Sequence, residues 1–219
     1  MMKILVVAAT RNEIEPLIES LDQVMSISEN EISGIFMRHT IDVLITGVGM
    51  SSTAYFVGIQ LSKGYDLFIN AGLAGTFDEE IDLSDVVVVK SDFFAELGAE
   101  DADEFISFDA MNLPGYYSFA ELYFENYLSD FKFVHACTVN KVHGNRNSIT
   151  SFKKRFPFVQ IESMEGASCA MASRITQIPF IQIRSISNRV EERNKSNWKI
   201  KPAIENLNWQ LIKLLTALK

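Results

Sequence analysis

Residues 160–193 read QIESMEGASCAMASRITQIPFIQIRSISNRVEER, a pattern that predicts a strand, a helix, a second strand and a polar loop. The segment opens on the end of an apolar run, small helix-forming residues fill 166–172, and a second apolar run begins at 179–183. In an open α/β sheet, ligands bind outside the carboxyl ends of the strands. Glu165 and Asn188 follow the two strand ends, so we expect both at a ligand site. The simpler alternative is that Glu165 only charges a helix N-terminus, where carboxylates are favoured.

Apolar runs of strand length recur along the whole chain, separated by segments with helical periodicity. Several runs are near-continuous, such as residues 85–89 (DVVVV), which is typical of strands buried on both faces. Such strands need helices on both sides, so we predict a three-layer α/β/α fold in one domain over residues 1–219. The predicted strands are 3–9, 41–46, 66–71, 85–90, 132–139, 157–161 and 179–186, and the predicted helices are 12–22, 50–63, 117–128, 146–154, 164–175 and 202–218. Residues 91–115 lack clear periodicity and are predicted to form an active-site or interface loop.

Composition and charge restrict the class of partner. With 47% hydrophobic residues the chain can bury a substantial core, and its net charge of -8 disfavours nucleic acid and anionic membranes as partners. No apolar run approaches the ~20 residues of a membrane span, and residues 4–9 are too few for a signal peptide. Cys137 and Cys169 lie in apolar segments and are expected as free thiols in a cytoplasmic protein. The expected partner is a small molecule.

The histidine and acidic residues do not form a metal motif. His143 is accompanied neither by a second His at motif spacing nor by a cysteine. Asp101 and Asp103 lack the Gly and the distal Glu of a calcium loop. We therefore expect no metal and no other cofactor.

Five short segments, in order along the chain, resemble the nucleoside phosphorylase and nucleosidase family. Residues 10–13 (TRNE), 47–50 (GVGM) and 70–75 (NAGLAG) each follow a predicted strand. Residues 164–165 (ME) and the strand end 184–188 (RSISN) complete the pattern. The resemblance covers nearly the whole chain. It implies a mixed central sheet, a purine nucleoside substrate and a homodimer.

Within this family, three further segments resemble the futalosine hydrolases: residues 97–101 (LGAED), 138–140 (TVN) and 186–194 (ISNRVEERN). That resemblance implies hydrolysis of the N-glycosidic bond of futalosine. The products would be hypoxanthine and dehypoxanthine futalosine, on a menaquinone pathway.

The family resemblance also implies roles for individual residues. Glu13 matches the glutamate that orients and deprotonates the attacking water, and Glu165 matches the one that accepts hydrogen bonds from the ribose hydroxyls. Such bonds strengthen as the sugar becomes electron-poor, so they stabilise mainly the transition state. The other residues expected at the sugar are Ser163, Met164, Gly72 and Leu73. From the residues alone, Glu13 is equally an exposed carboxylate in a first helical turn, and Met164 a core residue.

Asn188 departs from the pattern of nucleosidases that act on 6-aminopurines, which carry Asp at this position. An ionised Asp would repel O6 of a 6-oxopurine, whereas an Asn amide offers a donor to O6 and an acceptor to a protonated N7. Asn188 therefore fits hypoxanthine as the leaving base, unless it is only a turn residue. Val142 and His143 are expected at the other edge of the base. Arg193 and Trp198 are expected to meet the distal aromatic carboxylate of futalosine, unless they form a solvated loop.

Four other functions stay open. A methylthioadenosine/S-adenosylhomocysteine nucleosidase or an aminodeoxyfutalosine nucleosidase would share the fold, and Asn188 disfavours both. A phosphorylase of this fold binds phosphate through arginines; Arg11 is present, but residues 66–73 contain none and Glu13 would repel a phosphate. A non-catalytic purine-binding protein would not need both Glu13 and Glu165. The sequence leaves open the 5′-substituent and the subunit that completes the pocket.

Overall fold

The computed structural model describes every residue except 103, 120–124 and 219. A mixed sheet forms its centre, with strands in the order β11-β10-β6-β12-β5-β1-β4-β3-β2 and with β9 paired to β6. The strands are β1 (Lys3–Ala8), β2 (Asp22–Ser26), β3 (Glu31–Phe36), β4 (His39–Ile45), β5 (Leu67–Thr76), β6 (Val86–Phe93), β9 (Ser118–Phe119), β10 (Lys132–Thr138), β11 (Ile161–Ser163) and β12 (Phe180–Arg189). The helices are α1 (Arg11–Glu19), α2 (Met50–Leu61), α3 (Arg146–Arg155), α4 (Gly166–Thr176) and α5 (Ile200–Ala217).

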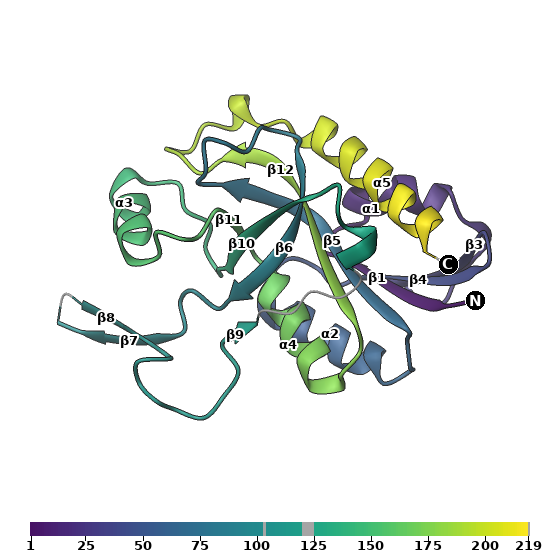
Figure 1. Cartoon of the computed structure of the whole chain (residues 1–219), viewed down its shortest axis with the longest axis horizontal. Helices are drawn as coiled ribbons and strands as arrows, with labels where there is room; N and C mark the ends of the chain where they lie inside the picture. The colour runs from purple at the N-terminus through teal and green to yellow at the C-terminus, as the bar shows by residue number, and fades with distance from the viewer. Residues whose placement is uncertain (103, 120–124, 219) are drawn as a thin grey trace.

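Helices cover both faces of the sheet (Figure 1). Along β1, Ile4 and Val6 pack into a core with the apolar sides of α1 and α5. Leu5 and Val7 point to the opposite face and pack into a second core with α2 and α4. Alternate side chains of a strand point to opposite faces of the sheet, so a strand whose residues are all apolar is buried on both faces. The predicted three-layer α/β/α fold with a mixed sheet is confirmed.

The pairing of the strands brings their ends together. β4, β1, β5 and β12, which are adjacent in the sheet, run parallel to one another. β11 pairs in parallel with β10 and antiparallel with β5, which closes this end of the sheet on itself. β11 runs back along the end of β5, so the carboxyl ends of β1, β11 and β12 all lie beside the second half of β5.

The predicted strand 157–161 was misplaced. Residues 157–161 were expected as a strand, but β11 starts only at Ile161, where pairing with Ala136 of β10 begins. Pro157 lacks the N–H that a strand would use, and the Phe158 side chain is 53% exposed. Apolar character alone did not mark the strand, because Pro157 and Phe158, which belong to the apolar run, lie on a turn.

The predicted helix 117–128 was wrong in its described part. Ser118 and Phe119 form β9, an antiparallel partner of the end of β6, and a short 3-10 helix, η1, covers Glu125–Tyr127. The rest of that prediction, residues 120–124, lies outside the described residues.

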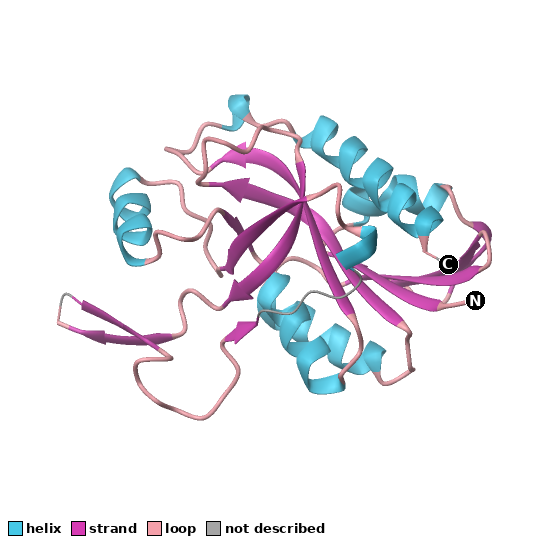
Figure 2. Ribbon diagram, viewed as in Figure 1, coloured by secondary structure: helices cyan, strands magenta, loops and turns pink. Residues whose placement is uncertain are grey.

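The predicted loop 91–115 contains regular structure. β6 continues to Phe93, and β7 (Gly98–Asp101) pairs with β8 (Glu104–Ser107) as an antiparallel hairpin. Figure 2 shows this hairpin projecting away from the main sheet. Its acidic sequence has no buried face, so no hydrophobic pattern could reveal it. The edge strand β2 and its neighbour β3 were also missed, and every residue of β2 is exposed.

Within the described part of the chain, no helix combines the length and apolar character needed to cross a membrane.

Candidate active site

A cavity of about 580 Å³ opens where the strand ends meet. Its wall comes from the residues after β1, the second half of β5, the end of β11, the end of β12 and the first turns of α5. Ten of the eleven residues predicted at the site line it: Glu13, Leu73, Val142, His143, Ser163, Met164, Glu165, Asn188, Arg193 and Trp198. Gly72 does not line it.

Glu13 is fixed between α1 and β5. It occupies the third position of α1, where its Oε2 accepts hydrogen bonds from the Thr10 backbone N–H and hydroxyl, both at 2.8 Å. Its Oε1 accepts from the backbone N–H of Leu73 at 3.1 Å. The carboxylate therefore caps the helix and is also held at the cavity wall. A role in the first helical turn and a position at the ligand site are thus compatible for Glu13.

Glu165 is a buried carboxylate at the N-terminus of α4. Its side chain is 6% exposed, and its Oε1 accepts from the backbone N–H of Gly49 at 2.9 Å. Burial raises the pKa of Glu165, while the positive charge of Arg184 and the Gly49 hydrogen bond oppose that rise. These two contacts favour the charged form, which is the form that accepts hydrogen bonds from hydroxyl groups.

Arg184 is a residue of this region that the sequence interpretation missed. It lies inside β12 with 1% exposure, and its Nη2 donates to Asn70 Oδ1. Among the described residues its Nε has no hydrogen-bond partner. The buried positive charge lowers the pKa of Glu165, which lies among acidic groups that repel it. An arginine within an apolar run was the available signal, because a buried charge needs a compensating partner.

Gly72 makes room for this arrangement. A Cβ at this position would lie 2.4 Å from Arg184 Nη1 and 3.3 Å from Glu13 Oε1. The absent side chain lets the guanidinium and the carboxylate approach the same face of β5. The structure therefore places Gly72 behind the cavity wall, not in contact with the cavity as predicted.

Asn188 lies at the end of β12 with its amide held on both sides. Its Oδ1 accepts from the Ser187 hydroxyl at 2.8 Å, and its Nδ2 donates to the Arg189 carbonyl at 2.9 Å. A Cβ on the neighbouring Gly75 would lie 3.0 Å from Asn188 Nδ2. The amide is thereby oriented over β5, and one N–H and one lone pair are left for a ligand.

His143 is paired with Glu162, a second residue absent from the predicted site. The Glu162 carboxylate is 3% exposed, and its Oε2 lies 2.6 Å from His143 Nδ1. Its Oε1 accepts from the backbone N–H of His143 at 3.0 Å. The imidazole also packs against Phe152, with ring centroids 4.5 Å apart. Both members of the pair line the cavity.

Arg193 and Trp198 form the polar outer part of the cavity wall. The Arg193 guanidinium carbon lies 5.0 Å from the centroid of the Trp198 ring, a cation–π arrangement. The Arg193 backbone N–H donates to the Gly144 carbonyl at 3.2 Å. The predicted charged and aromatic pair is thus brought together, next to the loop that carries His143.

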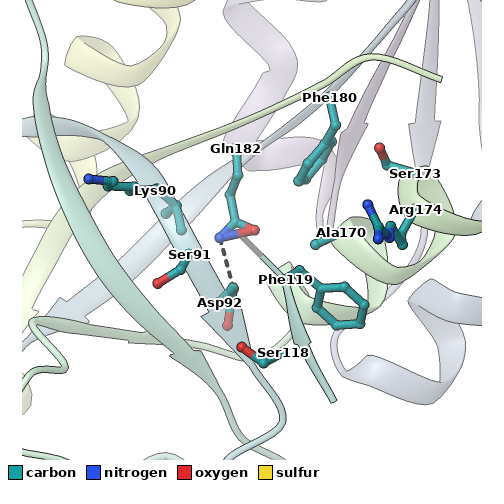
Figure 3. Close-up of a pocket in the computed structure, with 11 residues that line it drawn as sticks. Lys90, Ser91, Asp92, Ser118, Phe119, Ala170, Ser173, Arg174, Phe180 and Gln182 are labelled. Carbon is teal, nitrogen blue, oxygen red and sulfur yellow. Dashed lines mark hydrogen bonds between the residues drawn. The ribbon is translucent and has the colours of Figure 1, made fainter. Parts of the chain in front are cut away.

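A smaller cavity, of about 210 Å³, lies among β6, β9, β12 and α4 (Figure 3). Its polar wall centres on Asp92, whose Oδ2 accepts from Gln182 Nε2 at 2.8 Å (Figure 3). The other oxygen, Oδ1, accepts from Thr138 Oγ1 at 3.0 Å. None of the predicted site residues lines this cavity. The larger cavity is therefore the candidate active site.

The buried carboxyl of Asp92 predicts a pH effect on stability. Burial raises the pKa of Asp92 from 3.8 to about 7. The folded chain therefore binds this proton more tightly than the unfolded chain, and the resulting stabilisation is lost as the pH rises from about 4 through 7. Asp92→Asn should make Tm fall less than in the wild type between about pH 5 and pH 8, as scanning calorimetry would measure. Gln182 Oε1, which lacks a partner among the described residues, offers an acceptor to the new amide. An undiminished fall in the variant would contradict the assignment to Asp92.

Within the described residues, no group of three or more His, Cys, Asp or Glu side chains is arranged to hold a metal ion. Cys137 and Cys169 are free and buried, and burial raises the pKa of both thiols. Neither lines the larger cavity.

The family model described as the Phosphorylase superfamily matches residues 3–218. A futalosine hydrolase of Streptomyces coelicolor is 28% identical over 187 residues, which cover 81% of this chain and 80% of the relative. A 5′-methylthioadenosine/S-adenosylhomocysteine nucleosidase of Maridesulfovibrio salexigens is also 28% identical, over 218 residues and 89% of each chain. The solved structure of the Neisseria meningitidis nucleosidase of that type, in complex with methylthio-immucillin-A, has a TM-score of 0.84 at 17% identity and full coverage of both chains.

Proposed function

The chain belongs to the phosphorylase superfamily, and from this we propose that it is a nucleosidase that hydrolyses the N-glycosidic bond of a purine nucleoside. The observation that carries the proposal is the pair of carboxylates, Glu13 and Glu165, which both line one cavity and lie near the buried charge of Arg184. Relatives named as nucleosidases match most of the chain, which supports the same reaction class.

In the proposed reaction, the oxygen of a water molecule bonds to C1′ while the bond from C1′ to the purine breaks. The electron pair of that bond stays on the purine, which takes up a proton at N7 from solvent water. Glu13 orients the water and accepts the proton that it releases. Glu165 accepts hydrogen bonds from the ribose hydroxyls, which become better donors as positive charge develops on the sugar. Met164 and Ser163, next to Glu165, pack beside the ribose in this proposal.

Water, and not phosphate, is the proposed nucleophile. Arg11, the arginine of the first loop, pairs with Glu15 at 2.6 Å and does not line the cavity. The carboxylate of Glu13 occupies the wall instead, where it would repel a phosphate. Both features favour a hydrolase over a phosphorylase.

Futalosine is the proposed substrate, with hypoxanthine as the leaving base. The relatives named futalosine hydrolase and those named methylthioadenosine/S-adenosylhomocysteine nucleosidase match at similar identity, so the preference rests on Asn188. Its amide can donate to O6 and accept from N7–H of a 6-oxopurine. Arg193 and Trp198 supply a cation and an aromatic face for the distal benzoate-type carboxylate. The methylthioadenosine/S-adenosylhomocysteine nucleosidase is the second candidate, favoured by the likeness to the Maridesulfovibrio relative.

We also propose a cytoplasmic homodimer built from one domain per chain. Tyr55 and Ile59 lie four residues apart on α2, and both are more than half exposed. Residues at this spacing share a helix face, so they offer an apolar surface to a second copy. The buried free thiols fit a reducing compartment. Light scattering at assay concentration measures the oligomeric state directly.

A substrate panel tests the function. Futalosine, aminodeoxyfutalosine, methylthioadenosine and inosine are incubated with the enzyme, with and without phosphate, and release of the free base is measured. We expect hypoxanthine release from futalosine at the same rate in both buffers. A strict phosphate requirement would identify a phosphorylase, and faster release from methylthioadenosine would favour the second candidate. Binding without release from any substrate would leave only a purine-binding protein.

A further inference from the structure

The Glu162–His143 pair gives one edge of the cavity a defined hydrogen-bonding character. Glu162 uses both carboxylate oxygens on His143, one on the backbone N–H at 3.0 Å and one on Nδ1 at 2.6 Å. The bond to the carboxylate assigns the ring proton to Nδ1. Nε2 is then an acceptor, and no hydrogen bond among the described residues uses it. The backbone N–H of His143, which could otherwise donate to a ligand, is already occupied.

The sheet register places this pair across from Asn188. Glu162 of β11 lies opposite Gly75 of β5, and Asn188 of β12 lies opposite the same glycine on the other side. Gly75 has no side chain, and a Cβ there would lie 2.9 Å from Val190 Cγ2 and 3.0 Å from Asn188 Nδ2, so the glycine leaves room for the Asn188 amide over β5. Neighbouring strands lie about 4.8 Å apart, so the backbones of Glu162 and Asn188 are about two strand spacings apart. Glu162, His143 and Asn188 all line the same cavity.

We propose that the Glu162–His143 pair reads the N1 edge of the base and selects 6-oxopurines by accepting from N1–H. This inference rests on the proposed nucleosidase function and concerns the same cavity. A 6-oxopurine carries a donor at N1 beside an acceptor at O6, and a 6-aminopurine carries the reverse pattern. The acceptor Nε2 of His143 meets N1–H, and the Asn188 amide donates to O6. Against adenine, the lone pair of N1 faces the lone pair of Nε2.

Glu162 acts here as a positioning residue, because it determines which ring nitrogen of His143 carries the proton. Replacement by glutamine keeps the size of the side chain and its acceptor for the His143 backbone N–H. The amide, however, donates to Nδ1, so the ring proton moves to Nε2 and this edge becomes a donor. Glu162→Gln therefore changes Nε2 of His143 from an acceptor to a donor without creating a cavity at position 162.

The test measures the binding of free hypoxanthine and free adenine by calorimetry, which needs no turnover. We expect the wild type to prefer hypoxanthine and Glu162→Gln to lower the ratio of the two affinities by about tenfold or more. His143→Ala should weaken hypoxanthine and leave adenine nearly unchanged. Glu96→Gln is the matched control, since Glu96 also accepts a backbone N–H, that of Asn140 at 2.8 Å, but lies outside this cavity. Its ratio should match that of the wild type.

Each result separates the inference from the proposed function. An unchanged ratio in a folded Glu162→Gln protein, or equal losses for both bases, overturns the inference even if futalosine is hydrolysed. A wild type that binds neither base, or prefers adenine, also overturns it. A lowered ratio in an enzyme that releases no base from any nucleoside supports the inference while the proposed function fails. If Glu162→Gln does not fold, as Tm would show, the His143→Ala ratio decides in the same way.

Discussion

Glu13→Gln is expected to lower kcat for futalosine by about 10² or more while the protein still folds. Glutamine can keep the hydrogen bond from the Leu73 backbone N–H, which holds the side chain at the cavity wall. It cannot accept a proton from water, so the loss falls on the chemical step. The amide nitrogen would face the Thr10 N–H, and the weaker helix cap should cost about 1 kcal/mol of stability. Single-turnover assays and Tm measure the two effects separately.

Glu15→Gln is the matched control for this prediction. Glu15 lies two residues further along α1, pairs with Arg11, and does not line the cavity. Its replacement removes the same charge from the same helix, so kcat should stay near the wild-type value. Near wild-type turnover in Glu13→Gln would show that the water is activated elsewhere.

Much of this site could be predicted because it follows from local sequence and one rule of topology. Glu13 and Glu165 lie a few residues after β1 and β11, and Asn188 lies near the end of β12. The apolar runs revealed β1 and β12, and they located β11 only approximately. The ends of those strands lie beside the second half of β5, so Glu13, Glu165 and Asn188 line one cavity. The buried strands of the centre were also recognisable, since residues of β1 pack into cores on both faces.

Arg184 was missed because the length of β12 could not be read from the apolar run. The run suggests a strand that stops near Ile186, which makes Arg184 a polar residue at a strand end. β12 continues to Arg189, held by pairing with β5, so Arg184 lies in the interior. Its burial is a tertiary effect, since it depends on the acidic groups that surround it.

Glu162 and Gly72 show a different limit of the sequence. The contact between Glu162 and His143 joins residues 19 positions apart and requires the parallel register of β10 with β11. No spacing rule along one element encodes it. Gly72 stands in a motif that was read as a contact with the sugar, but its lack of a side chain makes room for Arg184 and Glu13. A glycine in a motif does not show which neighbour requires the space.

Asn188→Asp is expected to shift the preference from 6-oxopurine to 6-aminopurine nucleosides. Against hypoxanthine, the ionised carboxylate would set an acceptor against O6, at a cost of about 1–3 kcal/mol. That cost corresponds to roughly a tenfold to hundredfold loss in kcat/KM for futalosine. Against an adenine analogue, the carboxylate can accept from the 6-amino group and carry the proton for N7. The comparison to make is kcat/KM for futalosine and aminodeoxyfutalosine in both proteins.

Asn194→Asp separates this effect from a simple change in charge. Asn194 also lines the cavity, and its Oδ1 accepts from the Ser196 backbone N–H at 3.2 Å, a bond that an aspartate retains. The control therefore adds the same negative charge to the same wall without touching the proposed base contact. If charge alone mattered, both variants would weaken the anionic futalosine and aminodeoxyfutalosine equally. Because only Asn188 faces the 6-position in this proposal, only Asn188→Asp should change their ratio, and an unchanged ratio would leave no reason to prefer a 6-oxopurine on the strength of Asn188.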